Sequence, residues 1–140
     1  MNRVLVDTNV VLDVLLDRHP HAQASSTVWA AIETGTVEGL LAGHAITTIH
    51  YLIQKQLGNA KTTRFISRIV SVFGVAAIDQ GVIQEAIQLP CPDFEDAVTS
   101  AAARVAGCDY IVTRDPKGFR GSAVRCLTPE MALRILVQAP

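Results

Sequence analysis

The sequence has few cysteines, no long apolar run and almost no net charge. Its three cysteines, Cys91, Cys108 and Cys126, form no close pair, so neither a zinc knuckle nor a disulfide framework is supported. The apolar stretches are interrupted before about 18 residues, the length that would indicate a membrane span, and no signal-peptide pattern follows Met1. We therefore expect a cytoplasmic protein without membrane association. The formal net charge of -1 gives no overall attraction for nucleic acid, so any such binding must use local patches.

Apolar side chains, by contrast, are abundant. Hydrophobic residues make up 49% of the 140 residues and charged residues 18%, which is enough to build the core of one ordinary domain. The chain has no linker, internal repeat or low-complexity stretch, so we expect residues 1–140 to form a single domain. Part of the apolar surplus is available to cover a partner protein or a second copy of the chain, and we expect a homodimer.

Short apolar runs alternate with helix-like segments along the whole chain. The predicted strands are residues 3–6, 37–42, 75–78, 109–113 and 124–127. The predicted helices are residues 9–16, 21–33, 44–57, 59–73, 79–89, 93–105 and a C-terminal segment from Thr128. Strands interleaved with helices favour a parallel sheet with right-handed crossovers. The predicted fold is therefore α/β, with three α/β/α layers around a central parallel sheet of about four or five short strands.

Four aspartates stand where such a sheet would gather them. Asp7 and Asp115 each follow a predicted strand, and Asp93 and Asp96 open a predicted helix one turn apart. Open α/β sheets bind ligands at the carboxyl ends of their strands. Carboxylates that meet there raise each other's pKa unless a cation lies between them, and divalent metals prefer oxygen ligands. The sequence therefore predicts a divalent metal site and favours a metal-dependent hydrolase.

Each of these acids also has an ordinary structural explanation. Asp, Thr and Asn are all good helix N-caps, but one cap is enough, so we assign the site to Asp7 and the cap to Thr8 or Asn9. Thr8 and Asn9 would also orient Asp7 or a metal-bound water. Acids in the first turn of a helix are favoured by the helix dipole whatever their chemistry. The spacing of Asp93 and Asp96 nevertheless points both the same way, with Phe94 on the packing side.

The segment around Asp115 places hydroxyl and cationic groups beside an acid. An Asp-Pro turn after a strand needs no active site, and a basic loop is often only solvated. Thr113 and Arg114 are nevertheless the kinds of group that bind phosphate. Asp13, in an apolar stretch beyond Asn9, is a weaker candidate for a supporting role. The four histidines are expected at the surface or at helix caps.

Three segments together resemble the PIN domain, the fold of many small metal-dependent ribonucleases. They are the opening Val4–Asn9, the helix start Asp93–Ala97, and Asp109–Asp115 followed by Phe119. The resemblance covers nearly the whole chain. It implies a central parallel sheet with helices on both faces and an acidic pocket that holds Mg²⁺ or Mn²⁺.

Asp7, Asp96 and Asp115 match the first, third and fourth acidic positions of that family, which implies that they bind the metal and act in catalysis. The second position is usually a Glu in the helix after the second strand, but here the segment His44–Tyr51 contains no carboxylate. This segment is similar to the Thr-Thr-Ile-aromatic-Tyr stretch of a PIN subgroup. Two replacements are open: Asp93 as a further catalytic residue, or Thr47, Thr48 or His50 holding a water on the metal.

The resemblance implies an endoribonuclease that hydrolyses RNA phosphodiester bonds. Small free-standing PIN domains are often the toxin of a toxin-antitoxin pair, which implies a cognate antitoxin as a partner. One alternative is a PIN scaffold that is weakly active or inactive and only binds RNA or protein. Another is a phosphatase that uses Asp7 as its nucleophile, although such an enzyme would have an acid where Asn9 stands.

Overall fold

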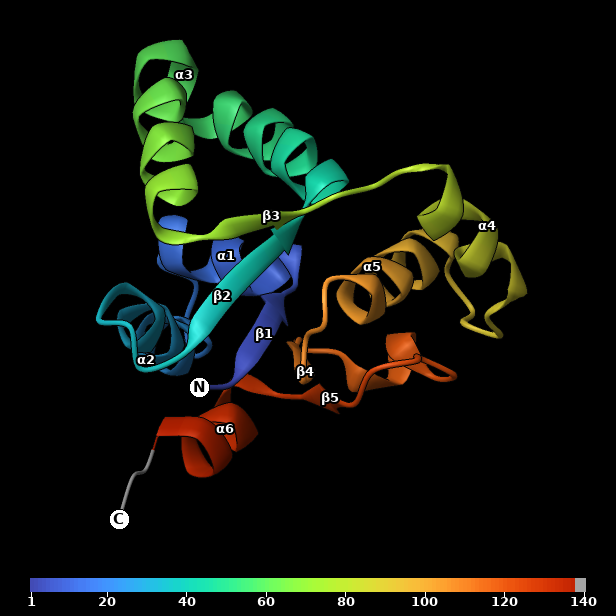
Figure 1. Ribbon diagram of the computed structural model, residues 1–140. Helices are drawn as coiled ribbons and strands as arrows, with labels where there is room; N and C mark the ends of the chain where they lie inside the picture. The colour runs from blue at the N-terminus through green and yellow to red at the C-terminus, as the bar shows by residue number, and fades with distance from the viewer. Residues whose placement is uncertain (138–140) are drawn as a thin grey trace.

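The computed structural model describes residues 1–137 and shows a central sheet between two layers of helices (Figure 1). All pairings in the sheet are parallel, and the strand order is β3-β2-β1-β4-β5. The strands are β1 (Arg3–Val6), β2 (Glu38–Ala42), β3 (Gly74–Ala76), β4 (Tyr110–Val112) and β5 (Cys126–Leu127). The predicted α/β class and five-stranded parallel sheet are confirmed.

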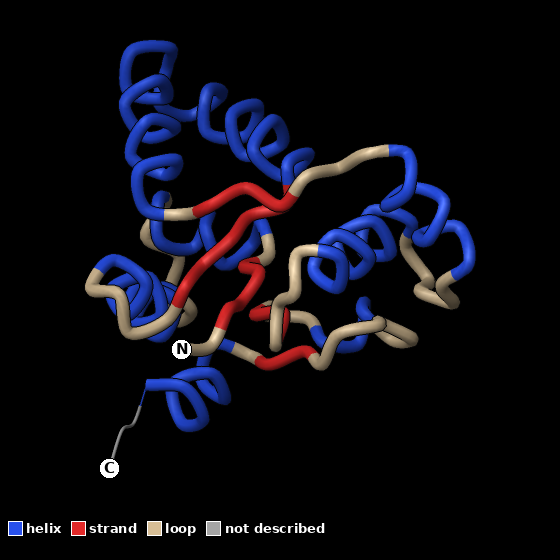
Figure 2. Tube along the Cα trace, in the orientation of Figure 1, coloured by secondary structure: helices blue, strands red, loops and turns tan. Residues whose placement is uncertain are grey.

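The helices cover both faces of the sheet (Figure 2). They are α1 (Thr8–Leu15), α2 (Ala22–Glu33), α3 (Gly43–Val72), α4 (Gln80–Gln88), α5 (Phe94–Val105) and α6 (Pro129–Ala132), followed by the π-helical turn η2 (Leu133–Val137). Helices α1, α2, α3 and α6 pack on one face, and α4 and α5 pack on the other. A short 3₁₀ helix, η1 (Pro116–Phe119), which the sequence pattern did not indicate, follows β4.

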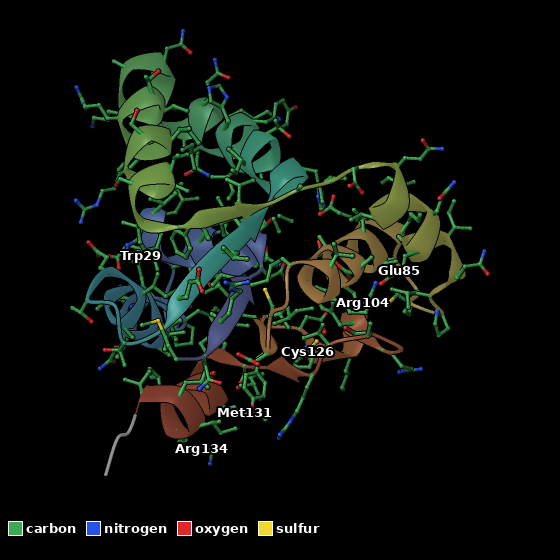
Figure 3. All side chains as sticks on the ribbon, in the orientation of Figure 1. Trp29, Glu85, Arg104, Cys126, Met131 and Arg134 are labelled. Carbon is green, nitrogen blue, oxygen red and sulfur yellow. The ribbon has the colours of Figure 1, made fainter. Side chains whose placement is uncertain are left out.

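The central strand β1 supplies side chains to both halves of the core. Val4 and Val6 face the larger apolar cluster, whereas Leu5 faces the cluster beneath α5, and all three are buried. Such two-sided burial explains why β1 appears in the sequence as an uninterrupted apolar run. Trp29 of α2 meets Phe73 edge to face, with ring centroids 5.0 Å apart. Figure 3 shows Trp29 on the opposite side of the molecule from Glu85 and Arg104.

Most predicted boundaries agree with the structure to within two residues. Residues 44–57 and 59–73 were predicted as two helices, and α3 indeed breaks at Gly58, whose φ of 77° favours glycine. Figure 1 shows the two halves of α3 meeting at an angle above β2 and β3. Strand β3 begins at Gly74 and is shorter than predicted. Within residues 1–137, no helix combines the length and the apolarity needed to cross a bilayer.

Candidate active site

Asp7 lies at the carboxyl end of the central strand and is also the N-cap of α1. Its main-chain N–H donates to the Val112 carbonyl of β4 over 2.9 Å. Its Oδ1 accepts the Thr8 main-chain N–H at 2.9 Å, and its Oδ2 accepts the Thr113 hydroxyl at 2.8 Å. The prediction that Thr8 or Asn9 provides the cap is therefore wrong. The extended backbone of Asp7 (φ -70°, ψ 151°) places its carboxylate next to the first N–H of the helix. Each carboxylate oxygen still has a lone pair that can bind a cation.

Thr113 connects Asp7 to Asp115. Its side chain is completely buried, and its hydroxyl donates to Asp7 while accepting the main-chain N–H of Asp115 at 3.1 Å. Strands β1 and β4 pair directly, with Val6 opposite Val112. Asp7 and Asp115 therefore follow neighbouring strands, as predicted, and a single hydroxyl fixes both.

Asp96 approaches Asp115 across Gly118 of η1. A Cβ built on Gly118 would lie 3.0 Å from Oδ2 of Asp96 and 3.0 Å from Oδ2 of Asp115. Two oxygens that close to one point lie within about 6 Å of each other, and the charge of Asp115 is among those that raise the pKa of Asp96. The glycine therefore leaves a small hollow between the two acids. No local pattern in the sequence pointed to Gly118.

Asp93 is the N-cap of α5. Its Oδ1 accepts the main-chain N–H of Asp96 at 3.0 Å, so the ordinary explanation of this residue applies. The cap also sets the orientation of the first helical turn, which carries Asp96. Phe94, in contrast to the prediction, is 54% exposed and does not pack on the core. It lies at the first position of the helix, where it has no neighbouring layer to cover it.

The acids share one electrostatic environment. The pKa of Asp96 is raised to about 7, chiefly by burial, and further by the negative charges of Asp7, Asp93, Glu95 and Asp115. Burial also raises the pKa of Asp7, while the hydrogen bonds from Thr113 and Thr8 and the charge of Arg114 lower it. A site that penalises its own negative charge in this way favours a bound cation.

The donor set fits a hard divalent cation bound partly through water. Within residues 1–137, no three His, Cys, Asp or Glu side chains stand close enough together to hold a metal ion by themselves. Mg²⁺ commonly keeps several waters and binds through one or two carboxylates, which matches the Asp96 and Asp115 pair at Gly118 with Asp7 nearby. Among the described residues, these acids are thus the group that would hold such an ion.

Arg114 contacts a buried carboxylate on α1. Its Nε lies 2.6 Å from Oδ2 of Asp13, whose other oxygen is 3.8 Å from Nη1 of Arg18. Asp13 is completely buried. The sequence indicated a supporting role for Asp13 and for Arg114. It gave no sign that the two form a pair, because they are far apart along the chain.

The remaining candidates take no part in this arrangement. Asn9 is exposed, the Thr8 hydroxyl has no hydrogen bond within residues 1–137, and Thr48 donates to the carbonyl of His44 in its own helix over 3.4 Å. His44 is not a surface or cap residue as predicted. It lies between α3 and α5 with Nε2 3.4 Å from the Thr99 hydroxyl, and its buried Nδ1 finds no partner in the described part of the chain.

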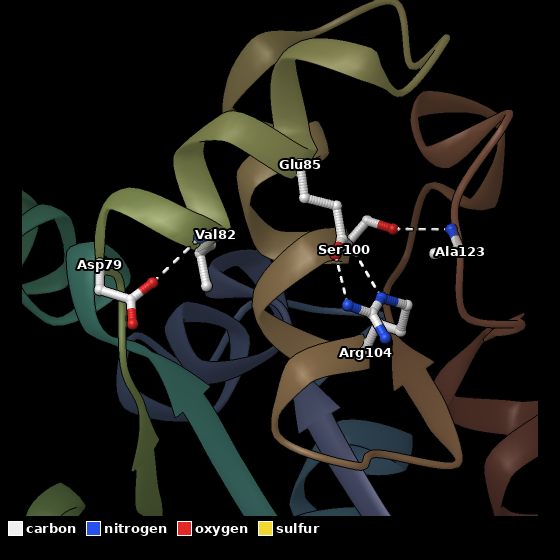
Figure 4. Close-up of polar contacts among 6 residues, drawn as sticks. All are labelled: Asp79, Val82, Glu85, Ser100, Arg104 and Ala123. Carbon is white, nitrogen blue, oxygen red and sulfur yellow. Dashed lines mark hydrogen bonds and ion pairs between the residues drawn. The ribbon is translucent and has the colours of Figure 1, made fainter.

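Polar contacts along α5 hold the helix that carries Asp96 (Figure 4). Arg104 forms a bidentate ion pair with Glu85 of α4, and its Nε donates over 2.6 Å. The Ser100 hydroxyl accepts the main-chain N–H of Ala123 at 2.9 Å. These contacts attach α5 to α4 on one side and to the segment before β5 on the other.

The chain belongs to the PIN domain family, whose model matches residues 3–117. Several solved structures are similar in fold. One is FitAcB from Neisseria gonorrhoeae, with 18% identity, 91% of this chain and 98% of that chain covered, and a TM-score of 0.67. Another is VapBC2 from Rickettsia felis bound to a DNA fragment from its promoter, with 10% identity, 90% of this chain and 98% of that chain covered, and a TM-score of 0.71. A third is VapC20 from Mycobacterium tuberculosis, described as a sarcin-ricin loop cleaving toxin, with 16% identity, 77% of this chain and 86% of that chain covered, and a TM-score of 0.61. No curated protein sequence matches the chain.

Proposed function

We propose that this PIN domain is a metal-dependent endoribonuclease that hydrolyses RNA phosphodiester bonds with Mg²⁺ or Mn²⁺. The observation that carries the proposal is the approach of Asp96 to Asp115 at Gly118, with the negative charge of Asp7 near enough to add to burial in raising the pKa of Asp96 to about 7. A group of acids that repel one another is destabilising by itself, and a divalent cation relieves the repulsion. The PIN membership of the chain supports the same chemistry.

In this proposal the chain's own residues position the cation and the substrate. Asp7, Asp96 and Asp115 would hold the ion, partly through its waters, and the ion would supply activation of a water and stabilisation of charge on the leaving oxygen. Thr113 fixes the direction of Asp7 through the 2.8 Å hydrogen bond. Asp93 orients the turn that carries Asp96 and adds negative charge beside it. Arg114 supplies a cationic group for a phosphate oxygen.

A binding module without catalysis is the second candidate. The observation in its favour is the segment His44–Tyr51, which has no carboxylate where PIN domains usually carry their second acid. Calorimetry with Mg²⁺ and Mn²⁺ separates the two: RNA binding without metal binding supports the module. An Asp-nucleophile phosphatase is disfavoured, because Asn9 is an exposed amide where that mechanism requires an acid.

A toxin role in a toxin-antitoxin pair follows from the similarity in fold. One neighbour, VapC20, is described as a sarcin-ricin loop cleaving toxin, and the FitAB and VapBC neighbours are bound to DNA. We extend this to a cytoplasmic protein that forms a homodimer and binds a cognate antitoxin. Growth arrest on expression, relieved by a co-expressed neighbouring gene product, tests this part separately from the chemistry.

The decisive experiment is cleavage of structured RNA with Mg²⁺ or Mn²⁺ by the natural chain and by Asp7→Asn and Asp96→Asn. We expect both variants to lose nearly all activity, since each removes a charge that holds the cation. Asp79→Asn is the matched control, because Asp79 caps α4 through the Val82 N–H (3.0 Å) and an asparagine caps equally well. Equal cleavage by all four proteins would identify a contaminating nuclease and refute the proposal.

A further inference from the structure

Asp13 is a carboxylate without access to solvent that contacts Arg114, the residue before Asp115. It lies on α1 among buried apolar residues, and its exposed fraction is 0%. Its two oxygens face Arg114 at 2.6 Å and Arg18 at 3.8 Å. No hydrogen bond to either oxygen is found within residues 1–137, so the contact with Arg114 is an ion pair without an aligned hydrogen bond.

Stability alone does not explain this pair. Removing two charges from water is costly, and apolar residues of similar size often stabilise a core equally well or better. A buried pair of this kind is better explained by what it orients. Arg114 stands in the chain between Thr113 and Asp115, and its charge is near enough to Asp7 to lower the pKa of that carboxyl, so the position of the guanidinium affects the acids.

Arg114 has groups left for a ligand. Its contact with Asp13 runs through Nε, 2.6 Å from Oδ2, and the side chain is 27% exposed. No hydrogen bond from its Nη groups is found within residues 1–137, so these N–H donors remain available. Its positive charge also reaches Asp7. The guanidinium is therefore held at one end by a buried acid, with its other donors available at the edge of the acidic site.

We propose that Asp13 is a positioning residue that holds Arg114 beside the pocket, where the free guanidinium N–H groups bind a non-bridging phosphate oxygen of the RNA. This inference rests on the proposed ribonuclease function. Arg can present two donors to one phosphate, and a guanidinium anchored at Nε loses little freedom when it does so. Asp13 acts only through Arg114 and touches neither metal nor substrate.

The test is a double-mutant cycle with Asp13→Asn, Arg114→Gln and the double variant, measuring kcat and KM for the RNA substrate. Each single variant is expected to raise KM by about tenfold, the loss typical of a charged hydrogen bond. The double variant should match Arg114→Gln, since Asp13 has no further role once Arg114 is gone. Arg68→Gln is the control: it breaks the exposed Arg68–Glu33 pair between α3 and α2 and should leave KM unchanged.

Circular dichroism and the melting temperature of each variant separate loss of fold from loss of positioning. If Asp13→Asn does not fold, Asp13→Glu takes its place: it keeps the negative charge but displaces Arg114 by one methylene, so it should also raise KM, and adding Arg114→Gln should raise KM no further than Arg114→Gln alone. Effects on KM that multiply in the double variant, or an unchanged KM in Asp13→Asn, would overturn the inference. Full activity in Asp7→Asn and Asp96→Asn would instead overturn the ribonuclease function itself.

Discussion

Adding one methyl group at Gly118 should slow RNA cleavage without unfolding the protein. The new Cβ of Gly118→Ala would stand 3.0 Å from a carboxylate oxygen of Asp96 and 3.0 Å from one of Asp115. Ordinary contacts of this kind begin at 3.4 Å. The carboxylates or the turn must therefore move by about 0.4 Å, and the methyl occupies the hollow between them. Since a misplacement of about 1 Å can cost about 100-fold in rate, we expect cleavage to fall about five- to tenfold.

Stability should hardly change in this variant. Gly118 has no positive φ, so alanine can adopt its backbone conformation, and replacing glycine at such a site stabilises a protein by about 0.4–1 kcal/mol. This gain in folding free energy offsets the cost of the crowded contacts at the new Cβ. The assays are the initial rate of RNA cleavage, Mn²⁺ affinity by calorimetry, and the melting temperature.

Gly81→Ala is the matched control for this prediction. Gly81 lies in α4, and its nearest contact for a new Cβ is Asp79 at an ordinary 3.5 Å. Cleavage and metal affinity should match the natural chain. If Gly118→Ala retained full rate and full Mn²⁺ affinity while folded, the ion would not lie between Asp96 and Asp115, and the account of the site would be wrong.

Three further predictions concern the charges and hydrogen bonds of the pocket. Because folding raises the pKa of Asp96 from 3.8 to about 7, the folded state holds a proton that the unfolded state has released, so without metal the melting temperature should fall as the pH rises from about 4 to about 7. Asp96→Asn should flatten this dependence, and an unchanged slope would contradict the assignment. Thr113→Val should lower the free energy of urea unfolding by about 1–3 kcal/mol, because Asp7 loses a donor and the main-chain N–H of Asp115 loses its acceptor, whereas Thr113→Ser should retain most activity. Asp93→Asn keeps the helix cap but removes the charge, so cleavage should fall less than in Asp96→Asn; equal losses would make Asp93 a ligand in its own right.

The sequence was sufficient to predict the sheet and the approximate position of the acids. Uninterrupted apolar runs mark buried parallel strands, and the acids at the ends of residues 3–6 and 109–113 follow directly from them. Gly58 predicts a helix break because glycine readily adopts a positive φ, and Asp79 predicts a helix start because aspartate is a good N-cap.

The features that only the structure provides are long-range. The hydroxyl of Thr113 reaches Asp7 because β1 and β4 pair in one register, and no local pattern specifies that register. Gly118 lies between two acids because η1 turns back over the start of α5. His44 is partly buried because α5 packs over the beginning of α3, which a single helix pattern does not reveal.

Thr113 makes the pocket depend on the short edge of the sheet. The main-chain N–H of Thr113 donates to the Leu127 carbonyl over 2.9 Å. Leu127 belongs to β5, an edge strand of two residues. Fraying of this edge would release Thr113 and Asp115 together, while Asp7 stayed anchored in the centre. Mild heat or denaturant that loosens this edge should therefore abolish activity reversibly before the rest of the sheet unfolds.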